Sequence, residues 1–272
     1  MHNHHRGATA PSIDFSTGSI VLLLPFMLVT VLYLWAVFFS KNNLGWPVHK
    51  TLLWIAGVTF VSFSVAGPLA EKAHEDFMVH MEVHLLLGML APLLMALAAP
   101  ATVILRALSV KNARIVTRVL KSRYSRFVSD PFVAAVLNVG GLWMLYRTDL
   151  FGLMHHIPAL HVIIHLHIFL SGYLFTISMV YIDPTPHRTS FYYRAGVLIV
   201  ALAGHGILSK SIYASPPSGI SASEAQAGGM LMYYGGDAVD ILLIILLCWQ
   251  WYKAARPRNA TSKRSEDATL PH

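Results

Sequence analysis

Charged side chains are scarce in this sequence. Of its 272 residues, 12% are Asp, Glu, Lys or Arg, whereas 55% are hydrophobic. An average soluble protein carries about 25% charged residues, so this chain has too little charge to cover a globular surface in water. The composition therefore excludes a soluble enzyme and favours a protein embedded in a membrane.

Several motifs that carry chemistry are also missing. Cys248 is the only cysteine, so the chain has no disulfide framework and no Cys-x-x-Cys pair. There is no Gly-x-x-x-x-Gly-Lys-Ser/Thr phosphate loop and no His-Glu-x-x-His metalloprotease motif. Because no catalytic motif is found, we do not expect an enzyme.

Long apolar runs are abundant instead. Each is close to the roughly 20 residues that a helix needs to cross a bilayer, and they are longer than the alternating segments of a membrane β-barrel. Gly172 and the glycine pairs at 228–229 and 235–236 are expected to allow close helix packing. We predict an all-α polytopic membrane protein, a bundle of seven transmembrane helices near residues 19–39, 51–70, 77–98, 131–147, 158–182, 193–213 and 228–252.

The basic residues are distributed unevenly along the chain. With the N-terminus outside, sixteen of the twenty lysines and arginines fall on the inner side of the bilayer. This bias predicts an external N-terminus and a cytoplasmic C-terminus, and it accounts for the net charge of +7 without nucleic acid. We place the membrane domain at 19–253, between a polar tail, 1–18, and a disordered cytoplasmic tail, 254–272. Its basic cytoplasmic segment, 101–130, is either an amphipathic helix on the membrane surface or a solvated loop.

Histidine is unusually common, with fifteen in the chain. Two pairs, His80 with His84 and His161 with His165, have a spacing of four residues, so each pair lies on one face of its helix. His155 and His156 are expected in an outer loop, and His167, on the far side of its helix from His165, in a structural role. In the outer half of the membrane the sequence places His80, His84, His161, His165, His205 and Asp237.

Two interpretations of these polar groups remain open. They either make hydrogen bonds between helices, or the five histidines ligate a metal with Asp237 orienting an imidazole. Imidazole suits copper, zinc and iron, and thioether combined with imidazole suits Cu(I). Met81 and other methionines fall in the same half of the membrane, although methionine also fills gaps in apolar cores. Copper is therefore the expected metal, held without thiolates and loosely enough to be passed on.

Three stretches of the chain form a recognisable pattern. They are His80-Met81-Glu82-Val83-His84 with Ala91-Pro92-Leu93-Leu94, then His161-x-x-x-His165 with Ser171-Gly172 and Asp183-Pro184, and the Gly228-Gly229 entry to the last helix. The pattern resembles the seven-helix cytochrome c oxidase assembly factors called CtaG, which are linked to caa-type oxidases. This chain departs from that pattern at Ala99, where the family has a glycine before Pro100, and at Phe175-Thr176 and Glu224-Ala225-Gln226.

The resemblance implies a role in maturing the oxidase through copper supply. Its partners would be cytochrome c oxidase subunits or copper chaperones, and its location the inner membrane of a bacterial cell. One alternative is a b-type haem protein in which His84 and His165 ligate the haem. Another is a transporter that relays protons or ions through His and Asp, although the nearly apolar inner halves of the helices offer a poor path.

Overall fold

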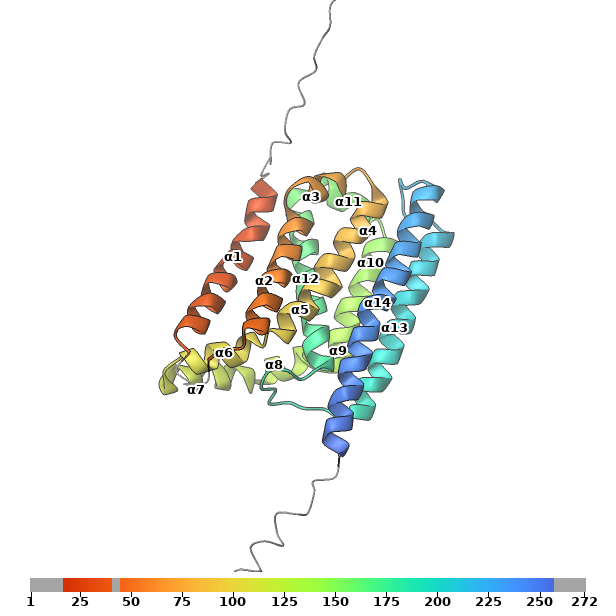
Figure 1. Cartoon of the computed structure of the whole chain (residues 1–272). Coiled ribbons are helices and arrows are strands. Elements are labelled where there is room, and N and C mark those ends of the chain that lie inside the picture. The colour runs from red at the N-terminus through yellow and green to blue at the C-terminus, as the bar shows by residue number, and fades with distance from the viewer. Residues whose placement is uncertain (1–16, 41–44, 257–272) are drawn as a thin grey trace, which may run out of the picture.

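The computed structural model describes residues 17–40 and 45–256. Within these ranges all regular structure is helical, which confirms the predicted class. The helices stand side by side in one bundle, and a group of short helices lies across one end of it (Figure 1). The expected tails, 1–18 and 254–272, lie almost entirely outside the described residues.

The bundle is built from long helices and two composite ones. The long helices are α1 (Thr17–Phe38), α2 (Val48–Val65), α12 (Pro158–Met179), α13 (Phe191–Ala214) and α14 (Ala222–Ala255). The first composite helix joins α4 (Phe77–Leu85), the π-helix η1 (Leu86–Leu90) and α5 (Ala91–Leu97). The second joins α9 (Pro131–Ala135), the π-helix η2 (Val136–Gly140) and α10 (Gly141–Arg147). Short helices connect them: α3 (Pro68–Lys72), α6 (Pro100–Ala107), α7 (Val110–Leu120), α8 (Arg123–Val128) and α11 (Leu150–His156).

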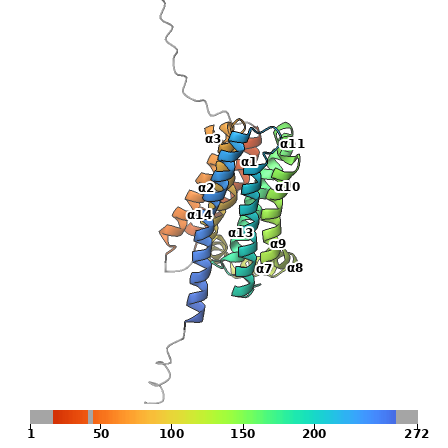
Figure 2. The ribbon, with the colours of Figure 1, turned by 90° about the vertical axis from the view of Figure 1, so that its right-hand side faces the viewer.

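Six of the seven predicted spans are present as helices long and apolar enough to cross a membrane. They are α1, α2, the α4–η1–α5 helix, α12, α13 and α14. The remaining one, expected at 131–147, is the second composite helix, whose pieces have 5, 5 and 7 residues. It packs against α12 and α13 and runs along α13 in the bundle (Figure 2). Its helical state is thus observed, and its crossing of the bilayer stays a prediction.

The two ends of the bundle differ in chemistry. At one end, here called the histidine end, α3 and α11 lie over the long helices (Figure 1). His74 follows α3 in the chain, and His155 belongs to α11. At the opposite, basic end, the expected segment 101–130 forms α6, α7 and α8 instead of one helix. α1 begins at the histidine end and α14 finishes beyond the basic end. The side of the membrane that each end faces stays a prediction.

Proline explains the π-helix in the first composite helix. Pro92 has no N–H, so it cannot return a hydrogen bond to the carbonyl of Gly88 four residues earlier. The chain widens there, and the N–H of Ala91 bonds to the carbonyl of Leu86, five residues back. The carbonyl of Gly88 meets Gly172 of α12, where any Cβ would overlap it. Gly172 therefore has the close-packing role that the sequence predicted.

Glycines also let α14 fit between α4 and α13. A Cβ on Gly228 would lie 3.1 Å from the side chain of Met81 on α4, and one on Gly236 would lie 2.5 Å from the ring of His205 on α13. The two glycine pairs of α14 thus serve the expected packing role. Met81, fully buried, packs against α14 in this contact.

Ala99 occupies a backbone conformation that favours glycine. It is fully buried and precedes α6 with φ 54° and ψ 56°, in the left-handed region. A left-handed residue with a Cβ costs about 1–2 kcal/mol, which explains why glycine suits this position in the family pattern.

We expect Ala99→Gly to leave the free energy of unfolding within about 1 kcal/mol of the wild type. Relief of the left-handed strain is offset by the lost methyl group and by a more flexible unfolded chain. Ala99→Val should instead lower it by about 2 kcal/mol or more, because a β-branched residue is poorly accommodated there. Thermal unfolding of the purified protein in detergent checks both, and equal melting temperatures for the two variants would contradict this account.

Candidate functional site

A cavity of about 440 Å³ opens between the helices at the histidine end. We call this cavity the histidine vestibule. Five imidazoles contribute to its wall, those of His74, His80, His155, His161 and His165. Glu71, Met154 and Ser64 complete part of the lining. The histidines come from α4, α11, α12 and the turn after α3, so residues far apart in the sequence share one cavity.

The two predicted helical pairs differ in how they meet this cavity. His161 and His165 both line it, with ring centroids 4.0 Å apart. Nδ1 of His165 forms a 2.9 Å hydrogen bond with the backbone carbonyl of His161, one turn earlier. His80 lines the cavity and its Nε2 is hydrogen-bonded to the hydroxyl of Tyr146 at 3.1 Å. His84, one turn deeper on α4, does not line the vestibule.

Two vestibule histidines were not among the predicted site residues. The ring of His74 lies 5.0 Å from that of His161 and 5.9 Å from that of His155. His155 also lies 6.5 Å from His80, and its Nδ1 is held by the carbonyl of Phe151 at 2.9 Å. The sequence signal was that both residues fall in short segments beside the starts of helices that carry the predicted pairs.

His74 is in the protonation state that a metal ligand requires. Partial burial at the cavity wall and, secondly, the nearby His155 lower the pKa of His74 below its usual value. Its imidazole is therefore neutral near pH 7, which is the form that binds metal ions.

Below the vestibule, His84 faces His205 of α13. We call these two residues the buried pair, since their side chains are only 3% and 6% exposed. Their ring centroids are 6.3 Å apart and their planes differ by 23°. His165 lies near enough to both His80 and His84 to interact with them electrostatically. The predicted histidines thus occupy two neighbouring levels of one bundle.

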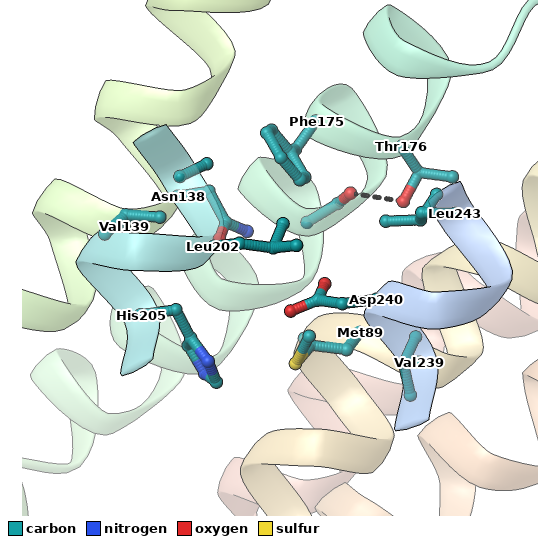
Figure 3. A pocket seen from close by; sticks show the side chains of 13 residues that line it. Met89, Asn138, Val139, Phe175, Thr176, Leu202, His205, Val239, Asp240 and Leu243 are labelled. Atoms are coloured by element: carbon teal, nitrogen blue, oxygen red, sulfur yellow. Dashed lines mark hydrogen bonds between the residues drawn. The ribbon is translucent and has the colours of Figure 1, made fainter. Parts of the chain in front are cut away.

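Two acidic residues of α14 lie near the buried pair, the predicted Asp237 and the buried Asp240. Asp237 interacts electrostatically with His205, but its side chain is on the exposed side of α14. Asp240 is 5% exposed and lines a cavity of about 30 Å³ together with His205 and Met89 (Figure 3). Its sequence signal was its position four residues after Gly236, on the face of α14 that packs into the bundle.

Other predicted residues take structural positions. His167, which the sequence assigned a structural role, forms a 3.1 Å hydrogen bond with the carbonyl of Leu137 in η2. Met81 lies in the contact between α4 and α14, while Met154 lines the vestibule. Cys248, on the part of α14 toward the basic end, is a free and exposed thiol.

No three His, Cys, Asp or Glu side chains in the described ranges, 17–40 and 45–256, are grouped tightly enough to hold one metal ion. The six predicted side chains therefore do not form a single cluster. They are divided instead between the vestibule, the buried pair and the exposed side of α14.

The fold and this site define a polytopic helical membrane protein with a histidine-lined cavity at one end. The model of the family described as cytochrome c oxidase caa3 assembly factor matches residues 31–254. The chain therefore belongs to the cytochrome c oxidase caa3 assembly factor family, which confirms the resemblance seen in its motifs.

Relatives in mycobacteria share this region. An uncharacterized protein of Mycobacterium leprae is 26% identical over 246 residues, which cover 82% of this chain and 37% of the relative. An uncharacterized protein of Mycobacterium bovis is 27% identical over 249 residues, covering 84% of this chain and 37% of the relative. The chain thus spans little more than a third of the length of these relatives. No solved structure matches it.

Proposed function

We propose that the protein assists the assembly of cytochrome c oxidase by receiving copper in the histidine vestibule and passing it to an oxidase subunit. The observation that carries this proposal is the gathering of five histidines, from four separate segments, around one cavity at one end of the bundle. Membership of the assembly factor family indicates cytochrome c oxidase as the partner, and the imidazoles are suitable ligands for copper.

The donor set suits transient binding of copper. The vestibule offers imidazole rings 4.0–6.5 Å apart and the thioether of Met154, but no thiolate. Imidazole and thioether bind Cu(I), and without a thiolate the ion is released more easily to a protein that offers one. This role requires binding and release only, so we propose no enzymatic reaction.

The expected orientation of the chain in the membrane supports this role. With the N-terminus outside, the histidine end faces the outer side of a bacterial inner membrane, and the basic helices α6–α8 face the cytoplasm. The excess of lysine and arginine at the basic end supports this orientation. A copper chaperone would then deliver the ion to the outer face, and an oxidase subunit would receive it there.

Adjacent histidines on α11 provide a direct test. Both histidines are exposed, but His155 lines the vestibule and His156 does not. We expect His155→Ala to weaken Cu(I) binding by at least about tenfold, equivalent to about 1.4 kcal/mol. His156→Ala should leave it unchanged. The measurement is competition between detergent-purified protein and a colorimetric Cu(I) chelator, and equal affinities of the two variants would refute the proposed site.

A further inference from the structure

The buried pair leaves ring nitrogens without partners. Nδ1 and Nε2 of His84, and Nε2 of His205, are buried and make no hydrogen bond within the described part of the chain. A buried polar atom without a partner costs free energy. A hydrogen bond to the neighbouring helix, as the alternative interpretation of these histidines required, is thus lacking at all three atoms.

The spacing of the two rings fits a shared ion. Their centroids are 6.3 Å apart, and their planes are 23° from parallel. The rings are stacked in this structure, so each side chain must rotate to turn one nitrogen toward the space between them. Once turned, two metal–imidazole bonds of about 2.0–2.1 Å span this separation. Two ligands are sufficient for a cuprous ion, which accepts lower coordination numbers than zinc does.

Both π-helical turns of the described chain border the space beside His205. Gly88 and Met89 of η1, and Asn138 of η2, line two small cavities of about 30 and 10 Å³, and His205 lines both. Each cavity is close to the volume of one water molecule or ion. π-Helical turns are frequent at functional sites, and here they bring the thioether of Met89 and the amide of Asn138 to the buried pair.

The charges around the pair favour a monovalent ion. Asp240 lines the larger cavity with His205, and it makes no hydrogen bond to any residue in the described ranges (Figure 3). Asp237 also interacts electrostatically with His205 and Asp240, but it is exposed and does not line this cavity. Two neutral imidazoles and the one buried carboxylate together balance a single positive charge. A divalent ion would leave a net charge buried among apolar helices, which is strongly unfavourable.

From these observations we infer that His84 and His205 form a second copper site, a buried position for one Cu(I) ion directly beneath the vestibule. This inference rests on the proposed role in copper handling, but it concerns different ligands. His165 neighbours both levels, so it is the residue through which an ion would move from the vestibule to the buried pair. The bundle would then hold two ions in sequence.

Copper stoichiometry separates the two sites. The full chain, purified in detergent, is saturated with Cu(I) supplied as its acetonitrile complex, and bound metal is counted by mass spectrometry. We expect two ions per wild-type chain, one in His84→Gln/His205→Gln, and one in the vestibule variant His74→Ala/His155→Ala/His161→Ala. Ser209→Ala is the matched control, because Ser209 is also buried and lies one turn from His205, bonded only to its backbone carbonyl.

The outcomes distinguish the two proposals. If His84→Gln/His205→Gln binds as much copper as the wild type, the buried site is refuted while the vestibule stands. If only this variant loses copper, the vestibule is refuted and the buried site stands. X-ray absorption of the vestibule variant loaded with Cu(I) keeps the test valid where a glutamine variant fails to fold. A spectrum that shows imidazole ligands around a copper ion of low coordination number supports the buried site. A spectrum without imidazole ligands overturns the inference.

Discussion

Replacing Gly172 by alanine is expected to prevent stable folding of the bundle, lowering the free energy of unfolding by more than about 3 kcal/mol. A Cβ at this position would overlap the carbonyl oxygen of Gly88 and crowd its carbonyl carbon at 2.9 Å. Both atoms are backbone, so neither moves aside by a change of rotamer. α12 would have to move away from η1, and the contacts made by Ile168 and Phe175 on either side would be lost with it.

Gly196 provides the matched control for this substitution. It also lies in a long helix, α13, but a Cβ there meets nothing within 4 Å. Gly196→Ala should therefore leave stability unchanged or raise it by about 0.4–1 kcal/mol, because alanine restricts the unfolded chain. Thermal unfolding and yield in detergent measure both variants. If Gly172→Ala melts at the temperature of Gly196→Ala, the close contact between η1 and α12 is wrong.

Replacing both His161 and His165 by alanine is expected to lower assembled cytochrome c oxidase at limiting copper to the level of a deletion strain. These two rings are the closest pair in the vestibule, 4.0 Å apart, so their loss removes the ligands that most readily share an ion. The messenger RNAs of the oxidase subunits should remain at wild-type levels, since the proposed defect is in metal delivery. Added copper should restore part of the activity by supplying the oxidase directly.

His49 and His156 form the control for this experiment. Both are exposed histidines outside the vestibule, so His49→Ala/His156→Ala removes the same number of imidazoles without touching the cavity. Oxidase is measured by its haem spectrum and activity in membranes, with the amount of each variant checked by immunoblot. Normal oxidase at limiting copper in the His161→Ala/His165→Ala strain would argue strongly against copper handling by the vestibule.

Much of the architecture could be predicted from the sequence, because a membrane imposes simple rules on the helices that cross it. A helix must satisfy its own backbone hydrogen bonds and present apolar side chains for about 20 residues. These rules alone predicted the six membrane-length helices and the composite helix at 131–147. The four-residue spacing of His161 and His165 likewise placed both rings on one helical face, as observed. Helical periodicity acts within a single element, and there the prediction needed no tertiary information.

The partners of each side chain depended on tertiary structure. His80 and His84 share a face of α4, yet one lines the vestibule and the other meets His205 deeper in the bundle. His74 and His155 join the vestibule only because short segments fold back over the histidine end. The rotation of a helix about its axis is set by its neighbours, and that rotation is what separates buried Asp240 from exposed Asp237.

The sequence by itself thus determined the class of protein, the helices and the types of ligand present. Only the tertiary structure decided which ligands meet, because that depends on helix rotation, on loop paths and on the two π-helical turns. A π-helical turn holds an extra residue, so the face that a regular α-helix would present is shifted beyond it. Gly88, Met89 and Asn138 reach the space beside His205 from such turns, which no regular helical spacing would have indicated.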